Sequence, residues 1–282
     1  MLKNQWMPNT AVLLACFNRK ENTINCLSQL LNLTKDIDVY VVDDNSTDGT
    51  AESIHSRFPE VRLIEGSGNL FWNRGMNLAW QQAATRDYEF YLWLNDDVIL
   101  YENCLKELYE CSNISNNKAI ISGIVESEDK LQILYGGTND KKKILKPNGK
   151  LNPITRMNGN VVLIPKSVYK SLGNLDPFFH HDLGDVDYGL RAKKNNISVF
   201  TTRVAIAFGL KNELCRVRLN KTTVYQRFKH LYTPLGSPPL IDFYFRKRHF
   251  GIINASINFV FLHFLNAIPD RMNETIFGKK YI

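Results

Sequence analysis

The sequence predicts an α/β fold, in which a mainly parallel central sheet is flanked by helices and followed by a C-terminal helical extension. Apolar runs at residues 11–16, 39–42, 61–65 and 88–94 alternate with segments of helical spacing. Such β-α-β alternation is typical of parallel sheets with right-handed crossovers. Acidic clusters directly follow the second and fourth runs, which is where open α/β sheets form their binding crevice.

The helices are expected between these strands. Residues 23–33 carry apolar side chains at helical spacing, and the turn-forming cluster 44–50 precedes a helix over 51–58. A third helix is expected over 76–84, before the fourth strand. Each helix would form the crossover between two strands of the sheet.

The middle of the chain has a different composition. Residues 127–157 contain Gly136-Gly137 and three consecutive lysines, 141–143, and a strand-like run follows at 161–164. This pattern predicts a β-hairpin or a mobile loop over the site, and not a linker. We interpret the lysines as a solvated loop face, with a phosphate or lipid contact as the alternative.

Composition limits the class of protein. A chain of 282 residues suits one large domain, or one domain with an appendage, and we place the boundary between 1–210 and 211–282. The formal net charge of +7 favours anionic partners without choosing among them. Five scattered cysteines without paired spacing favour a reducing compartment, and residues 1–8 lack a secretory signal. We therefore expect a cytoplasmic protein.

Three acidic clusters are the main chemical signal. A carboxylate pair without neighbouring His or Cys suits a hard cation, Mg²⁺ or Mn²⁺, that bridges to a phosphate. A nucleic-acid-binding module would explain the basic charge, but the acidic clusters would repel a phosphate backbone. The sequence therefore indicates an enzyme acting on a nucleotide-linked substrate, with no nucleic-acid partner. The clusters are Asp43-Asp44, Asn95-Asp96-Asp97, and the group Asp182, Asp185 and Asp187.

Six motifs, in this order, resemble those of family 2 inverting glycosyltransferases over about residues 10–205. The resemblance is nearest to bacterial rhamnosyltransferase-like enzymes that build surface polysaccharides. It implies a GT-A fold, a nucleotide-sugar donor and a divalent cation. The motifs are Ala15-Cys16-Phe17-Asn18-Arg19, Val42-Asp43-Asp44-Asn45-Ser46-Thr47-Asp48-Gly49-Thr50, Gly68-Asn69-Leu70-Phe71-Trp72-Asn73, Trp93-Leu94-Asn95-Asp96-Asp97, Asn158-Gly159-Asn160 and Gly184-Asp185-Val186-Asp187-Tyr188-Gly189-Leu190-Arg191.

The resemblance implies a donor site. Asp44 would accept a hydrogen bond from the imide N–H of a uracil or thymine ring, with a helix cap or Asx turn as the alternative. Arg74 would bind the diphosphate through charge-assisted hydrogen bonds, with a surface role as the alternative. The donor-binding residues implied are Ala15, Phe17, Arg19, Asp44, Asn69, Arg74 and Asp96.

The resemblance also implies a cation site. Asp97 would bind Mg²⁺ or Mn²⁺ directly, and Asp96 would face both the ribose and the metal. Two adjacent carboxylates repel one another unless a cation lies between them. Two departures from the family pattern concern this site: Asn95 replaces the first acid without removing the expected ligand, and residues 205–211 contain no His to complete the metal shell. Without that His, either the metal affinity is weaker or water completes the shell.

The position of the family's catalytic base falls on Asp185. Inverting transfer needs one carboxylate that deprotonates the acceptor hydroxyl as the hydroxyl attacks the anomeric carbon. Asp187 shares that face on an extended segment but points away on a helix, and Arg191 is interpreted as an ion-pair partner. The residues expected on the acceptor side are Asn158, Asn160, His181 and Asp187.

The C-terminal quarter mixes aromatic, basic and apolar residues. Residues 243–249 are aromatic and basic, and 251–269 are apolar but interrupted by Asn, Ser and His. The interruptions argue against a bilayer-spanning helix. We expect this segment to lie on an anionic membrane or to pack on the catalytic domain, and an oligomer interface is a further alternative.

The sequence thus predicts transfer of a sugar from a UDP- or dTDP-sugar to a hydroxyl of a saccharide or lipid-linked saccharide acceptor. One alternative is a sugar-phosphate nucleotidyltransferase, but residues 16–19 lack the Gly-rich phosphate loop that such an enzyme carries after its first strand. The other alternative is a non-catalytic nucleotide-sugar-binding protein.

Overall fold

The chain forms two compact units, and residues 8–210 and 217–281 are described by the computed structural model. The first unit comprises Met1–Pro177 and Gly184–Lys211, and the second comprises Phe178–Leu183 and Asn212–Ile282. The boundary after Lys211 lies one residue from the position expected. The sequence did not predict that a short segment, Phe178–Leu183, groups with the C-terminal helices. Residues 1–7, on which the expectation of no secretory signal mainly depends, lie outside the described part.

Four parallel strands form one half of the central sheet. They are adjacent in the order β3-β2-β1-β4, with every neighbouring pair parallel. This half provides the strand ends at which the acidic clusters lie. The strands are β1 (Thr10–Cys16), β2 (Asp38–Asp43), β3 (Arg62–Glu65) and β4 (Phe90–Leu94).

The other half of the sheet is mixed. β11 (Val161–Pro165) is antiparallel to both β4 and β6 (Ile120–Ser127), and β12 (Val199–Gly209) is parallel to β6 and antiparallel to β5 (Val98–Leu100). The segment predicted as a hairpin or loop forms short strands that extend this half and a separate antiparallel pair. These are β7 (Ile133–Tyr135), β8 (Gly137–Thr138), β9 (Asn152–Pro153) and β10 (Arg156–Met157).

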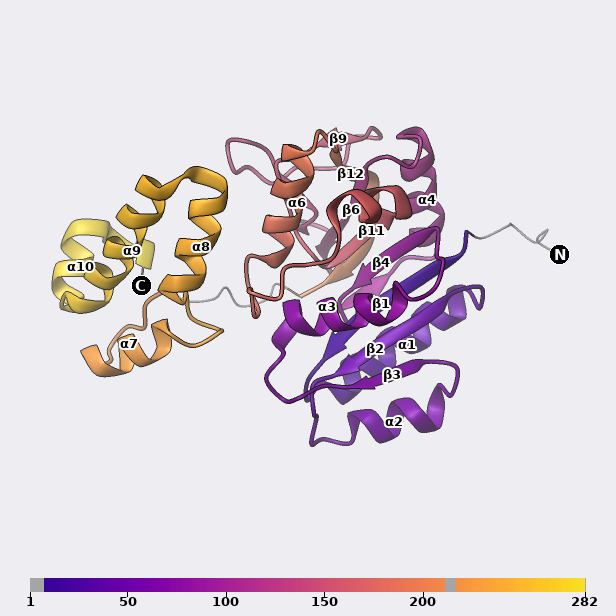
Figure 1. The fold of residues 1–282 in the computed structure, drawn as a ribbon, viewed down its shortest axis with the longest axis horizontal. Helices are drawn as coiled ribbons and strands as arrows, with labels where there is room; N and C mark the ends of the chain where they lie inside the picture. Colours follow the sequence, from indigo (N-terminus) through magenta and orange to yellow (C-terminus); the bar gives the residue numbers. More distant parts are fainter. Residues whose placement is uncertain (1–7, 211–216, 282) are drawn as a thin grey trace. The chain divides into compact units, whose positions relative to one another are not determined.

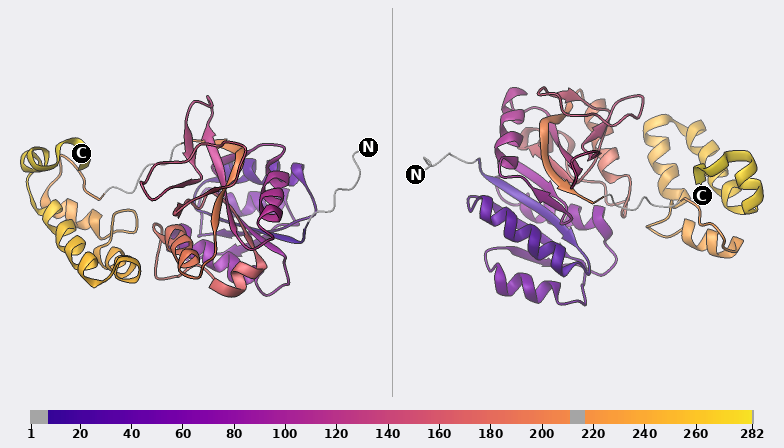
Figure 2. Two further views of the ribbon diagram at one scale, coloured as in Figure 1. Left: turned by 90° about the horizontal axis from the view of Figure 1, so that it is seen from above. Right: turned by 180° about the vertical axis from the view of Figure 1, so that it is seen from behind.

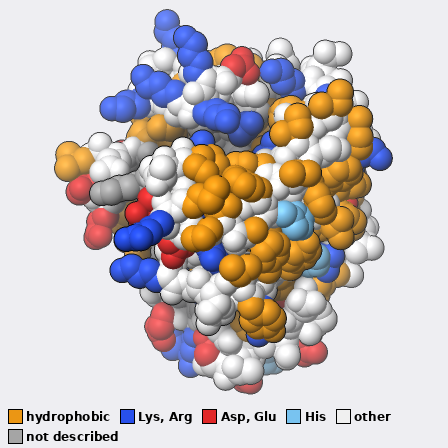
Figure 3. Space-filling view, turned by 90° about the vertical axis from the view of Figure 1, so that its left-hand side faces the viewer, with side chains coloured by type: hydrophobic (Ala, Val, Ile, Leu, Met, Phe, Trp, Pro, Cys, Tyr) orange, Lys and Arg blue, Asp and Glu red, His pale blue; other side chains and the backbone are white. Residues whose placement is uncertain are grey.

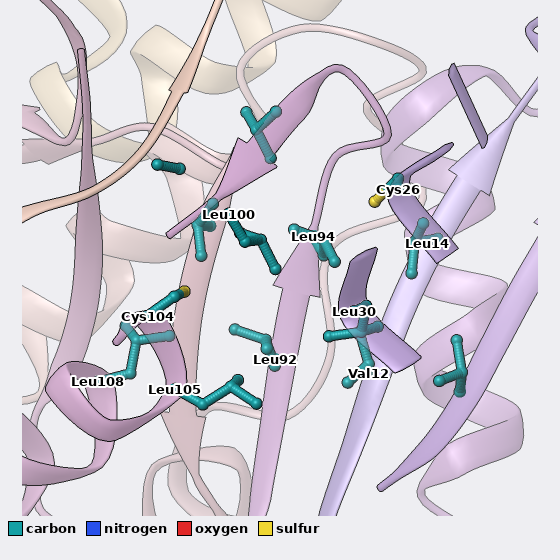
Figure 4. Close-up of a cluster of buried hydrophobic side chains, with 14 of the residues drawn as sticks. Val12, Leu14, Cys26, Leu30, Leu92, Leu94, Leu100, Cys104, Leu105 and Leu108 are labelled. Atoms are coloured by element: carbon teal, nitrogen blue, oxygen red, sulfur yellow. The ribbon is translucent and has the colours of Figure 1, made fainter. Parts of the chain in front are cut away.

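Helices cover both faces of the sheet because successive strand residues point to opposite sides. Val12 and Leu14 of β1 meet Leu30 of the first helix on one face (Figure 4), whereas Leu13 packs with Trp80 on the other. Figure 1 shows the resulting layers. The first face carries α1 (Lys20–Leu33), α2 (Thr50–Arg57) and α4 (Cys104–Ile114); the second carries α3 (Phe71–Ala83), α5 (Lys166–Leu172) and α6 (Gly184–Lys194).

The second unit is helical, as the sequence predicted (Figure 2). The mainly parallel α/β sheet with a helical extension is therefore confirmed. Among the described residues, no helix has the length and apolarity needed to cross a membrane. The helices are α7 (Val224–Leu231), α8 (Pro239–Phe250), α9 (Ile252–Ala267) and α10 (Asp270–Phe277), followed by a 3₁₀ turn (Gly278–Tyr281).

Candidate active site

Polar loops join the ends of β1 and β2. The side-chain oxygen of Asn18 accepts a hydrogen bond from the Thr47 backbone N–H at 2.7 Å, and the Asn18 N–H donates to Ser46 Oγ at 2.8 Å. Asp48 accepts from the Lys20 N–H at 3.0 Å, and Asp43 accepts from the Ser46 N–H at 3.2 Å. Both carboxylates therefore serve the turn itself.

Asp44 holds the loop that leads into α3. Its buried carboxylate accepts backbone N–H groups from Gly68 at 2.7 Å, Leu70 at 2.7 Å and Phe71 at 3.1 Å. Three accepted bonds leave one lone-pair position, so this residue acts as a cap for α3 across the sheet. Its contact with the donor base stays a prediction, as do the roles of the exposed Asn69 and the half-exposed Phe17.

Arg19 bridges the two carboxylates that follow β4. Its guanidinium lies 3.3 Å from an oxygen of Asp96 and 3.3 Å from an oxygen of Asp97. Asp96 also accepts from the Thr23 hydroxyl at 2.8 Å. Burial raises the pKa of the Asp96 carboxyl to about 6, Arg19 and Thr23 oppose this increase, and Asp97 adds to it. The pair is thus costly to keep ionised unless positive charge is near.

The two carboxylates fit a cation held jointly with a substrate. The Asp97 side chain is 8% exposed, and neither of its oxygens has a hydrogen-bond partner. Mg²⁺ typically takes one or two carboxylates and completes its octahedron with phosphate oxygens and waters. Among the described residues, no group of three or more His, Cys, Asp or Glu could hold a metal ion by itself.

A cavity opens beside Asp97. Its volume is about 260 Å³, and its walls come from α1, from β5 and from the end of β12. Cys26 and Gln29 of α1 and Phe208 of β12 line it together with both carboxylates. The cavity is large enough for a cation's water ligands or a phosphate group beside the pair.

Asn95 connects the strand ends, a role that the sequence did not reveal. Its Oδ1 accepts from Trp72 Nε1 at 2.7 Å, and its Nδ2 donates to Asn160 Oδ1 at 2.5 Å. Its backbone N–H also donates to the Asn160 carbonyl at 2.8 Å. An amide can donate and accept at once, which a carboxylate cannot. The Asn in place of the first acid was the available signal.

Asp185 lies in the first turn of α6. Its two oxygens accept backbone N–H groups from Gly159 at 2.9 Å and from Val186 at 2.7 Å. Glycine is required at two positions beside this carboxylate. A Cβ at Gly159 would lie 2.5 Å from a ring carbon of Trp72, and a Cβ at Gly184 would lie 1.7 Å from Asn73 Oδ1. Both bonds fix the carboxylate near a helix N-terminus, which favours its charged form.

A continuous set of contacts links Asp185 to the cation carboxylates. Gly159, which donates to Asp185, precedes Asn160, and Asn160 is bonded to Asn95, which precedes Asp96 and Asp97. All of these residues belong to the first unit. The fold therefore holds a base candidate and a cation candidate at the same end of β4 and β11.

Asp187 points away from this group, as expected for a helix. Its side chain is fully buried and accepts from Arg191 Nε at 2.9 Å. Arg191 also donates to the carbonyls of Leu172 at 2.8 Å and Asn174 at 2.9 Å. The buried carboxylate supports α6 through this bond, and its expected place on the acceptor side stays a prediction.

The remaining predicted residues are distributed more widely. Asn158 accepts from the Asn160 N–H at 3.3 Å, while Arg74 Nε donates to the Pro177 carbonyl at 2.8 Å. Ala15 packs beneath α3, where a Cβ at Gly75 would lie 2.8 Å from it. His181 belongs to the second unit and lines a cavity of about 50 Å³ there. Burial lowers the pKa of its imidazole, which Asp182 opposes.

Comparison with known proteins gives a family and a curated relative. The family model described as glycosyl transferase family 2 matches residues 11–170. A curated relative is the low-salt glycan biosynthesis hexosyltransferase Agl10 of Haloferax volcanii. It is 23% identical over an alignment of 211 positions, and the match covers 71% of this chain and 67% of that protein.

Solved structures resemble the fold. The mannosyltransferase PcManGT of Pyrobaculum calidifontis, in complex with GDP-Man and Mn²⁺, superposes with a TM-score of 0.54 at 13% identity, covering 90% of this chain and 74% of that one. TarS of S. aureus, residues 1–349, superposes with a TM-score of 0.55 at 14% identity, covering 96% and 75%. At these identities the likeness concerns the fold alone.

Proposed function

Since this chain belongs to glycosyl transferase family 2, we propose that it is an inverting glycosyltransferase acting in glycan synthesis, with Asp185 as its general base. The proposed donor is a UDP- or dTDP-sugar, and the proposed acceptor is a hydroxyl of a saccharide or lipid-linked saccharide in bacterial surface polysaccharide synthesis. One observation carries the proposal: the linked contacts that place Asp185 and the Asp96-Asp97 pair at the same end of two adjacent strands.

In this mechanism Asp185 accepts the proton of the acceptor hydroxyl as that oxygen attacks the anomeric carbon. The hydrogen bonds from Gly159 and Val186 keep the carboxylate oriented before the acceptor arrives. A single displacement without an enzyme nucleophile inverts the anomeric centre. Trp72, held by Asn95, provides an aromatic wall next to Gly159.

Asp96 and Asp97 would hold Mg²⁺ or Mn²⁺, which neutralises charge on the leaving diphosphate when bound. Arg19 is a counter-ion of both carboxylates. Its side chain is 41% exposed, so it can turn toward a phosphate when a cation takes its place. The mannosyltransferase PcManGT has a similar fold, and its structure was solved in complex with GDP-Man and Mn²⁺. This complex supports the proposal of a cation-dependent reaction with a nucleotide sugar.

The direct test is a donor panel. Purified protein is incubated with UDP-, dTDP- and GDP-sugars, with Mn²⁺ or Mg²⁺ or with a chelator, and released nucleotide is measured. We expect release from one class of donor, dependent on the cation and increased by a saccharide acceptor. Release of pyrophosphate from a sugar phosphate and a nucleoside triphosphate would support a nucleotidyltransferase instead. Donor binding without turnover on any acceptor would support a non-catalytic binding protein.

A further inference from the structure

Helix α9 presents an apolar stripe to solvent. Ile253, Ile257, Val260 and Phe264 are spaced by four, three and four residues, and between 43% and 74% of each side chain is exposed. Such spacing places all four on one face of a helix. None of the 16 residues of α9 is Asp, Glu, Lys or Arg. A soluble monomer rarely leaves such a continuous apolar face uncovered.

The neighbouring helices widen this apolar area. Tyr232, after α7, bonds through its hydroxyl to His263 of α9 at 2.7 Å, and Phe277 of α10 lies 5.7 Å from Phe261 of α9 between ring centroids. Figure 3, which faces these helices, shows a broad hydrophobic area with histidines within it. Further exposed apolar side chains of these helices are Val224, Tyr225, Tyr232, Met272 and Ile276.

The charge of the whole protein resides in this part of the chain. Asn212–Ile282 contains eleven Lys and Arg and four Asp and Glu, so its formal net charge is +7. This value equals the formal net charge of the complete sequence. Two arginines serve the fold: Arg218 and Arg227 are buried, donate to the carbonyl of Ile268 at 3.2 Å and 2.8 Å, and pair with Asp270. Exposed cations among the described residues are Lys221, Lys229, Lys247, Arg271 and Lys280.

We propose that the second unit binds the surface of an anionic phospholipid membrane, with the exposed face of α9 in the interface and its long axis along the membrane plane. The 16 residues of α9 span about 24 Å, which is shorter than the hydrocarbon core of roughly 30 Å. An exposed apolar stripe in a part of the chain that is rich in Lys and Arg favours an anionic membrane surface. A second copy of this chain is a less suitable partner for the exposed face of α9, because it has the same positive charge.

The test is sedimentation of the full chain with lipid vesicles. Vesicles of phosphatidylcholine alone are compared with vesicles of equimolar phosphatidylcholine and phosphatidylglycerol. We expect binding to the anionic vesicles only, weakened by added salt. Ile253→Glu with Ile257→Glu should weaken this binding at least tenfold, and Lys247→Gln should weaken it about fivefold.

The matched control is Leu131→Glu. Leu131 is 77% exposed and lies in the first unit, so the substitution places one Glu, against two in the α9 variant, at a comparably exposed apolar position. Vesicle binding should be unchanged by it. Each variant is checked for an unchanged thermal unfolding midpoint. Point variants are preferred to truncation before Asp242, because truncation would uncover Phe179, which packs against Tyr244 and Phe245.

Three outcomes would overturn the proposal. One is equal binding to both kinds of vesicle, and another is no binding to either. The third is a dimer in sedimentation velocity that the α9 variants dissociate, which would make this face an interface between copies. Vesicle binding is measured without donor or acceptor, so its failure leaves the proposed reaction untouched, and failure of the donor panel leaves the vesicle result standing.

Discussion

The two units of the protein differ in charge and in surface. Residues 1–211 contain 24 Lys and Arg and 24 Asp and Glu, whereas Asn212–Ile282 carries the entire net charge of +7. Among the described residues, thirteen of the twenty exposed large hydrophobic side chains lie after residue 211. The first unit holds carboxylates at the ends of β2 and β4, while the second exposes apolar and basic groups. This difference fits our proposals that the first unit carries the reaction and that the second binds a membrane surface.

The largest loss of activity is expected for a substitution at Asp185, and it should affect the first unit's reaction without changing the second unit's membrane binding. Asp185→Asn keeps the shape of the side chain but removes the base, so turnover should fall by roughly 10²-fold or more. Nucleotide affinity and vesicle binding should stay near those of the unchanged protein. The measurement is nucleotide release at saturating donor and acceptor. Near-normal turnover in this variant would exclude Asp185 as the base.

Asp97→Ala should weaken binding of the nucleotide donor. A methyl group cannot ligate a cation, so we expect cation-dependent nucleotide affinity to fall by about a hundredfold, the upper end of the cost of disturbing a metal's supporting residues. Calorimetric titration with nucleotide, with Mn²⁺ or a chelator present, measures it. Affinity in the chelator should be the same for both proteins. An unchanged cation dependence would show that Asp97 is not a ligand.

Asp187→Asn tests whether Asp187 stabilises α6 or takes part in the reaction. The substitution weakens the buried bond with Arg191, and we expect the free energy of unfolding to fall by about 2 kcal/mol. Turnover per folded molecule should fall less than tenfold, because the side chain faces inward. Chemical denaturation and nucleotide release on the same preparation test both statements. Inactivity with unchanged stability would return Asp187 to the reaction.

The smallest effect is expected at Arg19. Arg19→Gln removes the counter-ion that lies 3.3 Å from each carboxylate of the pair. Mn²⁺ alone should then bind about fivefold more tightly, the scale of a partly exposed ion pair. Electron paramagnetic resonance of free Mn²⁺ measures this without donor. Weaker Mn²⁺ binding would mean that Arg19 positions the carboxylates for the cation and does not compete with it.

Local patterns predicted most of the parallel half of the sheet. β1, β2 and β4 are mostly buried runs that the apolar residues mark out, whereas β3 has no fully buried residue. The start of α3 was missed: a helix was expected from residue 76, but α3 begins at Phe71. Its first turn is capped by Asp44, which is 27 residues away from Phe71 in the chain. A cap supplied from another strand leaves no signal in the helix's own sequence.

The site was predicted in part, for a similar reason. The acids at strand ends could be named from the sequence, whereas the contacts that relate them depend on pairing between strands. Asn95 and Asn160 are 65 residues apart and meet only because β4 and β11 are adjacent and antiparallel. Asp187 was ambiguous because its direction depends on whether α6 begins before or after it.

The central claim, a single displacement assisted by Asp185, is tested most directly by the anomeric configuration of the product. The nucleotide sugar selected by the donor panel is converted with a saccharide acceptor, and the new glycosidic linkage is examined by nuclear magnetic resonance. The account predicts a configuration opposite to that of the donor. Retention of the donor's configuration would contradict it, because retention needs a different mechanism in which Asp185 would not be the general base of one direct attack.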